Sequence, residues 1–430
     1  MNDSRECARQ MLDFIEKSPS SYHVIASVRA ELEKKGFQPL RETEPWELQD
    51  GCGYYVIRND SSLIGFRLPE DSRGPEGFHI TASHSDSPSF KVKCAPEMIV
   101  EEHYLKLNTE KYGGMILATW LDRALSVAGR VAVQENGRVV TRLVNVEEDL
   151  LVIPNVAVHL NRNINSGIEY NPQVDMLPLY AGFDKEKGKD RFMRRIGEAA
   201  GVKPEDILGH DLFLYVREKG RILGDEGEFV MSPRLDDSQC VFACTKAFAE
   251  SMPSNYMNVC AVFDNEEVGS GTRQGADSTF LEDVLWRIGE GLQMSRAEFL
   301  QKIAGSFLIS ADNAHAVHPN HPEKSDPTNR PYLNGGPVIK YHGSQKYTTD
   351  AVSAAKIKAW CVTAGVPYQS YANRSDVVGG STLGNISTAH VSVASADIGL
   401  PQLAMHSAVE TAGIRDTQYA YDMLKAFYQE

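Results

Sequence analysis

The sequence lacks several features that would place it in a special class of protein. No run approaches the roughly 18 consecutive apolar residues of a membrane-spanning helix. The charged residues 1–6 are followed by no hydrophobic stretch of the kind a signal peptide carries. The seven cysteines are odd in number and scattered, without the paired CxxC spacing of a zinc ribbon. We therefore expect reduced thiols and a cytoplasmic protein that does not associate with membranes.

Positive charge is also scarce in this chain. It has 44 Lys and Arg residues against 58 Asp and Glu, which gives a formal net charge of -14. Because each phosphate contact needs a lysine or an arginine, a surface of this charge repels polyanions. The composition therefore argues against nucleic acid as a partner.

The chain is long enough for two domains. Its 430 residues exceed what one hydrophobic core usually supports. Residues 1–92 and 231–430 alternate apolar runs with helical patterns, which predicts an α/β domain with a mainly parallel central sheet flanked by helices. Strand signals dominate residues 93–230, including a hairpin with Asn136-Gly137 at its turn. We predict that this β-rich domain is inserted into the α/β domain.

Acidic and histidine residues recur where apolar segments end. The stretch Val262-Phe-Asp-Asn-Glu-Glu-Val-Gly269 places three carboxylates within four positions, directly after an apolar run. A solvated turn explains such a stretch by itself. However, five apolar or extended segments end in this way, at His84, Asp236, Glu266-Glu267, Asp312 and His406. In an open α/β sheet, ligand sites gather outside the carboxyl ends of the strands, so we expect these side chains to converge.

Two imidazoles and three carboxylates are a ligand set that suits divalent metal ions. They can serve two ions if one carboxylate bridges, and a metal removes the free-energy penalty of burying unpaired carboxylates. Taken singly, each residue has a plainer interpretation. A lone histidine is more often a hydrogen-bonded core or surface residue, and Asp236-Asp237 alone is more often a turn or a helix cap. Five coincidences at segment ends favour the metal site.

The chain resembles the aspartyl aminopeptidase family of dinuclear zinc metallo-aminopeptidases, nearly from end to end. The matching motifs include Ser83-His-Ser-Asp-Ser-Pro88, Pro233-Arg-Leu-Asp-Asp237, Asp264-Asn-Glu-Glu-Val-Gly-Ser270, Ser310-Ala-Asp-Asn-Ala-His315 and Gln402-Leu-Ala-Met-His-Ser407. The resemblance implies two divalent ions per subunit, with zinc favoured and cobalt or manganese also suited to the ligands.

The resemblance also implies a role for each residue. It implies two metal sites that share a bridging carboxylate: His84 and Asp312 at one, Glu267 and His406 at the other, and Asp236 between them. Asp86 would orient the imidazole of His84, and Glu266 would be the general base. Neighbouring side chains on an extended backbone point in different directions, so we expect Glu267 to coordinate metal while Glu266 stays available for proton transfer.

Two further positions follow from the resemblance alone. Lys340 matches a family lysine near the substrate, where a cation suits an acidic side chain or the oxyanion; an ordinary surface lysine is the plainer alternative. His159 matches a histidine that the inserted domain of one subunit extends into a neighbour's active site. The family further implies dimers assembled into a closed dodecamer, so residues 93–230 would be an oligomerisation domain.

The predicted activity is removal of the N-terminal residue from peptides, with acidic Asp or Glu as the first residue that the family favours. Two departures leave that preference open here: Met405-His-Ser-Ala-Val-Glu410 lacks an arginine that many members carry, and Val377-Val378 follows Ser375-Asp376. The alternatives are a non-catalytic cage or scaffold on the same fold, and a related metal-dependent deacylase or carboxypeptidase. Glu266 argues against a scaffold, and a requirement for a free α-amino group would separate the enzymes.

Overall fold

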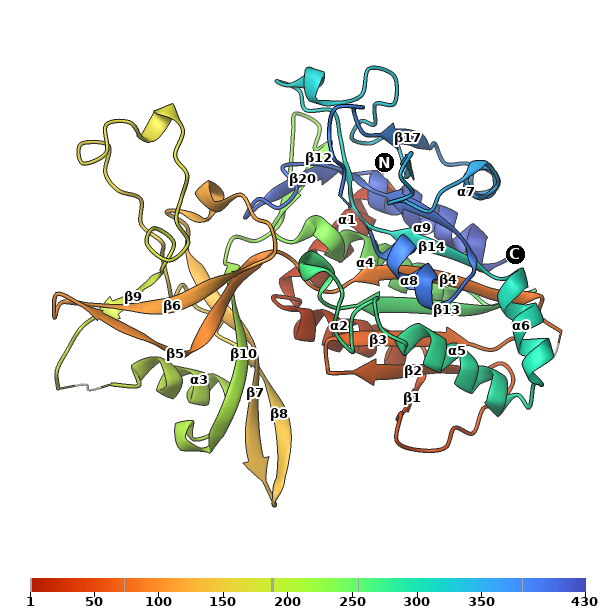
Figure 1. Cartoon of the computed structure of the whole chain (residues 1–430), viewed down its shortest axis with the longest axis horizontal. Helices are drawn as coiled ribbons and strands as arrows, with labels where there is room; N and C mark the ends of the chain where they lie inside the picture. Colours follow the sequence, from red (N-terminus) through yellow and green to blue (C-terminus); the bar gives the residue numbers. More distant parts are fainter. Residues whose placement is uncertain (1, 73, 187–188, 254, 381) are drawn as a thin grey trace. The chain divides into compact units, whose positions relative to one another are not determined.

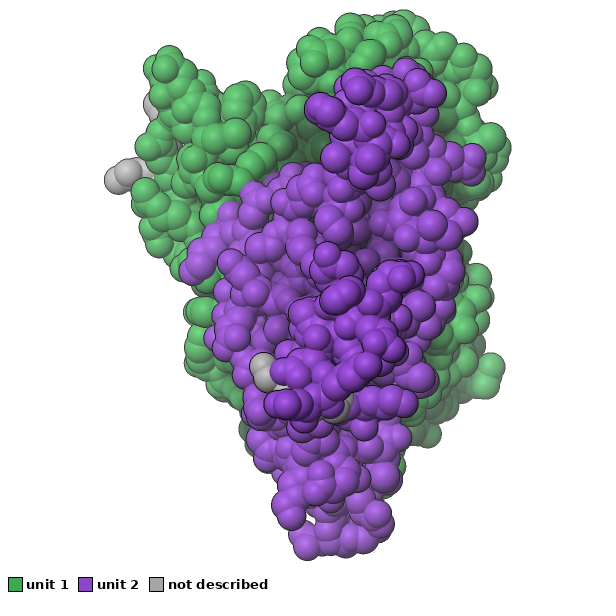
Figure 2. All heavy atoms as spheres, turned by 90° about the vertical axis from the view of Figure 1, so that its left-hand side faces the viewer, with its two compact units in different colours: residues 1–86, 220–405, 410–430 green, residues 87–219, 406–409 purple. Residues whose placement is uncertain are grey.

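The structure is a computed structural model that describes residues 2–72, 74–186, 189–253, 255–380 and 382–430. The chain divides into two compact units, which Figure 2 draws in green and purple. Unit 1 comprises Met1–Asp86, Gly220–Met405 and Glu410–Glu430, and unit 2 comprises Ser87–Lys219 and His406–Val409. The main segment of unit 2 ends at Lys219 rather than at the predicted residue 230, because the strands that follow Lys219 pair within a sheet of unit 1.

Unit 1 is built on a mixed sheet that is parallel at its centre (Figure 1). Among the described residues its nine strands lie in the order β1 (Gln38–Leu40), β2 (Gly53–Arg58), β3 (Ser62–Arg67), β13 (Tyr256–Phe263), β4 (Gly77–His84), β14 (Phe307–Ala311), β18 (Ala394–Gly399), β16 (Val338–Tyr341) and β17 (Gln369–Ala372). Strands β13, β4, β14 and β18 are mutually parallel neighbours. Antiparallel pairing is confined to β2 with β3, β3 with β13, and β16 with β18 in the described part of the sheet.

Helices cover both faces of this sheet. One face packs against α1 (Asn2–Glu16), α2 (Ser21–Lys34), α4 (Leu235–Glu250), α7 (Ala351–Ala364) and α9 (Asp416–Tyr428). The other face packs against α5 (Phe280–Gly291), α6 (Arg296–Gly305) and α8 (Leu383–His390). Because helices cover both faces, the central strands are buried on both sides rather than on alternate residues; every residue of β4 and of β14 is buried. This arrangement confirms the predicted α/β fold class.

The register of the central strands brings their carboxyl ends to one edge. His84, the last residue of β4, lies opposite Phe263, the last residue of β13. On the other side of β4, Ala82 pairs with Ser310 near the end of β14. Parallel strands that end together place whatever follows them in a common space. The residues after Phe263 and after Ala311 therefore share that edge with His84.

The strands of a second, smaller sheet of unit 1 precede two other predicted ligands, Asp236 and His406, in the chain. Among the described residues its order is β11 (Arg221–Leu223), β12 (Phe229–Ser232), β20 (Glu410–Gly413), β19 (Pro401–Leu403) and β15 (Ala314–His315). β12 leads into α4, and the chain reaches His406 three residues after β19 ends.

Unit 2 is an antiparallel sheet with its own apolar core. Within the described ranges its strands lie in the order β8 (Arg138–Asn145), β7 (Leu125–Glu135), β10 (Ile207–Val216), β5 (Ser89–Val100), β6 (Tyr104–Tyr112) and β9 (Leu179–Gly182), and α3 (Arg191–Ala200) adds to the core. The predicted hairpin is confirmed, since Glu135 pairs with Arg138 across Asn136-Gly137 and both turn residues have positive φ. No helix in the described stretches of either unit has the length and apolar character needed to cross a bilayer.

Candidate metal centre

Three predicted ligands of unit 1 meet at the carboxyl edge of the central sheet. His84 Nε2 lies 3.4 Å from Asp236 Oδ1 and 3.8 Å from Asp312 Oδ1. With Asp237 these residues form a buried set whose candidate ligand atoms all lie within 4.8 Å of one another. An imidazole and several carboxylates at this spacing are a chemically suitable donor set for a divalent cation such as zinc.

Asp236 reaches the cluster from a different element than the sequence suggested. The expectation that it ends a strand is wrong, because β12 stops at Ser232 and Asp236 lies in the first turn of α4. Its backbone departs from helical geometry, the peptide bond to Asp237 is cis, and its N–H donates to the carboxylate of Glu410 at 3.0 Å. The strand-end rule therefore accounts for His84 and Asp312, but not for the proposed bridging residue.

The side of His84 that faces away from this cluster is held by Asp86. The imidazole Nδ1 lies 3.0 Å from the backbone carbonyl oxygen of Asp86 and 3.4 Å from its carboxylate. An Nδ1–H that donates to this carbonyl leaves Nε2 with its lone pair toward Asp236 and Asp312. Asp86 thus orients the ring chiefly through its main chain, while its carboxylate serves a second purpose.

That second purpose is to hold the two glutamates. Asp86 Oδ1 accepts a hydrogen bond from the N–H of Glu266, and Oδ2 accepts one from the N–H of Glu267, both at 3.1 Å. The two glutamates begin a short 3-10 helix, η4 (Glu266–Val268), so the expectation of extended backbone is wrong. Their carboxylates nevertheless form a group with His84 in which the candidate ligand atoms lie within 4.8 Å of one another.

The cluster concentrates negative charge where access to water is limited: His84, Asp236, Asp237 and Asp312 are buried, and Glu266 and Glu267 are half-buried. Burial raises the pKa of Glu266 to about 8, and the carboxylates of Asp312, Asp86 and Asp236 add to the rise. Burial and the charge on Asp236 raise the pKa of Glu267 well above its usual range. Burial alone would lower the pKa of His84, but Asp237, Asp236 and Asp312 raise it well above the ordinary value.

These shifts describe a site that attracts positive charge. Without a cation, protons must neutralise part of the cluster, and the groups whose raised pKa lets them take protons up are the His84 imidazole, Asp237 and the two glutamates. A bound metal ion supplies the same positive charge and requires neutral imidazole and ionised carboxylates as ligands. The donor set and its electrostatics therefore fit a metal ion.

Lys340 of β16 lies beside the cluster and is buried. Its Nζ is 3.6 Å from Asp312 Oδ2 and 5.5 Å from the centre of the Tyr347 ring, with 3% of the residue exposed. Burial alone would lower the pKa of this amine, but Asp312 raises it, so Lys340 carries a positive charge. The plain alternative of an ordinary surface lysine is wrong.

The two remaining predicted residues belong to unit 2. His406 begins the segment His406–Val409, and its Nδ1 contacts the carbonyl oxygen of Gly114 in the same unit. His159 lies in an exposed turn after Ile153. The roles of both residues stay predictions.

Sequence reasoning missed Asp237, which it treated only as part of a cap. Asp237 is completely buried, and its Oδ2 accepts the backbone N–H of His84 at 3.1 Å. This bond ties α4 to the end of β4 at the cluster. The acidic doublet Asp236-Asp237 was the available signal.

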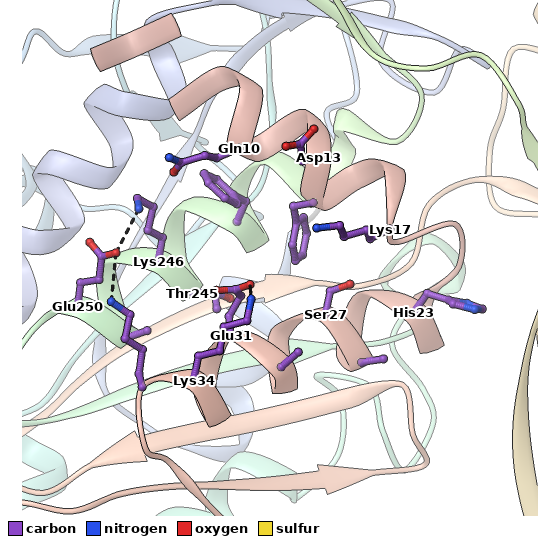
Figure 3. Close-up of a pocket in the computed structure, with 16 residues that line it drawn as sticks. Gln10, Asp13, Lys17, His23, Ser27, Glu31, Lys34, Thr245, Lys246 and Glu250 are labelled. Carbon is purple, nitrogen blue, oxygen red and sulfur yellow. Dashed lines mark hydrogen bonds and ion pairs between the residues drawn. The ribbon is translucent and has the colours of Figure 1, made fainter. Parts of the chain in front are cut away.

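A pocket of about 550 Å³ lies elsewhere in unit 1, between α1, α2 and α4 (Figure 3). Phe14 and Phe242 contribute apolar surface, and Glu250 pairs with Lys246 at 3.1 Å and with Lys35 at 3.6 Å. The described residues that line it include none of the predicted metal ligands. This hollow is therefore separate from the acidic cluster.

Comparison with known proteins identifies the family. Residues 14–428 match the family model described as aminopeptidase I zinc metalloprotease (M18). A probable M18 family aminopeptidase 2 from Clostridium novyi (strain NT) is 47% identical over the full length of both chains. The chain belongs to the M18 family and is a zinc-metallopeptidase-type aminopeptidase.

Solved structures agree with this assignment. A chain in the cryo-EM structure of the Ape4 and Nbr1 complex has a TM-score of 0.95 and 36% identity, covering 99% of this chain and 86% of that one. A chain of the S. cerevisiae mApe1 dodecamer has a TM-score of 0.85 and 26% identity, covering 99% and 97%. The family assignment goes against the scaffold, deacylase and carboxypeptidase alternatives.

Proposed function

We propose that the chain removes the N-terminal residue of peptides with the help of two metal ions. His84 and Asp312 would hold one ion, Glu267 and His406 the other, and Asp236 would bridge them. The observation that carries this proposal is the mutual approach of His84, Asp236 and Asp312 within 4.8 Å, next to the paired glutamates. The buried excess of carboxylates supports a cationic occupant.

The protein side chains would divide the chemistry between them. Bound zinc lowers the pKa of a water ligand to about 7 and polarises a carbonyl group. Glu266 would take a proton from the attacking water and pass it to the leaving amine. Asp86 would hold Glu266 in reach through the N–H bond at 3.1 Å. Neighbouring carboxylates would bind the free α-amino group, which limits cleavage to the first residue.

The preference for the first residue of the substrate depends on whether Lys340 binds the side chain of that residue or the oxyanion. We propose that Lys340 faces the substrate beside Asp312, where its buried positive charge suits an acidic side chain or the developing oxyanion. Turnover of Asp, Glu and Leu p-nitroanilides separates the two uses. Preference for Asp and Glu supports recognition of an acidic side chain, whereas preference for Leu removes it.

We also propose a homo-oligomer, with dimers assembled into a dodecamer through unit 2. The solved S. cerevisiae mApe1 assembly is a dodecamer, and the match covers 97% of its chain. His159 is exposed on unit 2 and so is available to a neighbouring subunit. His159→Ala should leave the mass in solution unchanged and slow turnover, and an unchanged rate in an intact oligomer would remove His159 from the site. A cytoplasmic location stays a prediction.

Metal analysis of the purified protein tests the proposal most directly. We expect about two ions per chain, in agreement with the family's ligand set, and loss of peptidase activity after chelation with recovery on adding zinc. The wild-type protein and the aminoacyl p-nitroanilide panel suffice for this measurement. Absence of cleavage with any added divalent ion would contradict the proposal.

A further inference from the structure

A buried amide stands next to the metal cluster. Asn313 follows Asp312 directly and is 2% exposed. Its Nδ2 lies 2.9 Å from Gln239 Oε1 and 3.3 Å from Gln402 Oε1, and also 3.3 Å from the carbonyl oxygen of Leu400. Its Oδ1 accepts a hydrogen bond from Cys240 Sγ at 3.5 Å. One side chain therefore connects the residue after a proposed ligand to two other segments of unit 1.

Those two segments lead to other proposed ligands. Gln239 and Cys240 lie on α4, three and four residues after Asp236. Gln402 lies on β19, four residues before His406 along the chain. Gln239 is in turn anchored away from the cluster, where its Nε2 donates to Thr417 Oγ1 of α9 at 3.0 Å.

The hydrogen bonds of this network can all form in only one arrangement of these segments. Gln239, Gln402 and Thr417 are at most 1% exposed, so water does not replace a lost partner. Buried amides are costly unless their hydrogen bonds are made, so the bonds that Asn313 and Gln239 make oppose any rearrangement of these segments. If α4 moved relative to the end of β14, the hydrogen bond between Asn313 and Gln239 would break. The same displacement would separate Asp236, which lies in α4, from Asp312, which directly follows β14.

We propose that Asn313 is a positioning residue that fixes the separation of Asp236 and Asp312, and through it the zinc affinity of their site. This inference rests on the proposed function, in which these two carboxylates hold an ion. Residues that orient metal ligands without touching the metal typically contribute about 10- to 100-fold to metal affinity. Asn313 contributes on that scale.

Two variants test this role from opposite sides of the hydrogen bond. Asn313→Asp keeps the shape of the side chain but replaces the Nδ2 donor with an oxygen that faces the acceptors on Gln239 and Gln402. Gln239→Met keeps nearly the same volume and removes the Oε1 acceptor. We expect both variants to bind zinc about 10- to 100-fold more weakly than the wild type, measured by competition with a chromophoric chelator on the full-length protein.

Thr417→Val provides the matched control. This variant leaves a buried amide of Gln239 without its partner, as a purely structural defect would, but it keeps every bond of Asn313. We expect its thermal midpoint to fall with that of Gln239→Met while its zinc affinity stays at the wild-type value. A merely structural role for the network predicts instead that zinc affinity changes in all three variants or in none.

The outcomes separate this inference from the proposed function. Folded Asn313→Asp and Gln239→Met proteins with wild-type zinc affinity would overturn the positioning role while leaving the metal site intact. If Asn313→Asp does not fold, Gln239→Met decides alone. A wild-type protein whose zinc affinity is the same as that of His84→Ala would instead contradict the proposed metal site.

Discussion

Strand β4 carries two buried histidines, His79 near its start and His84 at its end, and the groups around the two rings differ. His79 is 2% exposed and His84 is 1% exposed. The His79 ring stacks between Tyr256 and Phe427, with centroid distances of 3.7 Å and 4.1 Å, and its Nδ1 donates to the Phe427 carbonyl oxygen at 2.7 Å. Burial lowers the pKa of His79 to about 3.

His84 is equally buried, yet its surroundings reverse the effect. Burial would lower its pKa as well, but Asp237, Asp236 and Asp312 raise it well above the usual value. Burial therefore does not distinguish the two histidines; the carboxylates around the ring do. His79 exemplifies the common structural role of a lone histidine, and His84 is the one for which we propose a metal-ligand role.

Removing His84 should have the largest effect. His84→Ala deletes the imidazole that Asp236 and Asp312 face at 3.4 Å and 3.8 Å. We expect the zinc content of the protein to fall and turnover to drop by several orders of magnitude, because water activation depends on the metal. Metal analysis and aminoacyl p-nitroanilide hydrolysis measure the two effects.

The matched control for this variant is His79→Phe, which keeps an aromatic ring between Tyr256 and Phe427. It should retain both zinc and turnover. If the two variants lost zinc to the same degree, the difference between the surroundings of His79 and His84 would have no functional meaning.

Glu266→Gln should have the next largest effect. The amide keeps the shape of the side chain and the backbone N–H bond to Asp86, but it does not accept a proton. We expect turnover to fall about 10²- to 10⁴-fold while zinc binding and oligomer mass stay at wild-type values. Unchanged turnover would dismiss Glu266 as the base, and loss of zinc would assign it to the ligands instead.

The sequence predicts most at the centre of the sheet and least at its surroundings. His84 and Asp312 follow buried apolar runs, and parallel strands with common ends bring such residues together. Asp236 escapes this rule because it reaches the site from the first turn of α4. The contacts of Asp86 with η4 could not be predicted either, since they join residues that are 180 positions apart. Pattern reasoning locates strand ends, whereas side-chain partners depend on packing that only the folded chain defines.

The acid stability of the protein should reveal the state of His79. Its pKa is lowered to about 3 in the native fold against an ordinary 6.5. Below pH 6.5 His79 takes up a proton in the unfolded chain but stays neutral in the native state. The free energy of unfolding therefore decreases as the pH falls from 6.5 toward 3. The positive charge of Lys356 lowers the pKa of His79 further and so adds to the effect of burial.

His79→Phe removes this contribution. Relative to the variant, the wild type should lose up to about 1.4 kcal/mol of unfolding free energy for each pH unit below that point. Urea titrations of both proteins at pH 7, 6 and 5 measure the difference, which also cancels contributions from the metal ligands. Parallel pH dependences would show that His79 is protonated in the native state.

The smallest effect is expected from the ion pairs beside the pocket of Figure 3, which contrast with the buried cluster because water reaches them. Lys246 and Glu250 lie 3.1 Å apart on α4 with 26% of each side chain exposed. Lys246→Met keeps the aliphatic stem and removes the charge, while Glu250 retains Lys35 at 3.6 Å and the Tyr421 hydroxyl at 2.7 Å. We expect the free energy of unfolding, measured with urea, to fall by about 0.3–0.5 kcal/mol. The loss should be smaller at high salt, and zinc binding and turnover should be unchanged.

The more exposed ion pair of Lys34 with Glu31 provides the comparison, since Lys34→Met should change stability even less. A loss of zinc in either variant would mean that these ion pairs are coupled to the cluster.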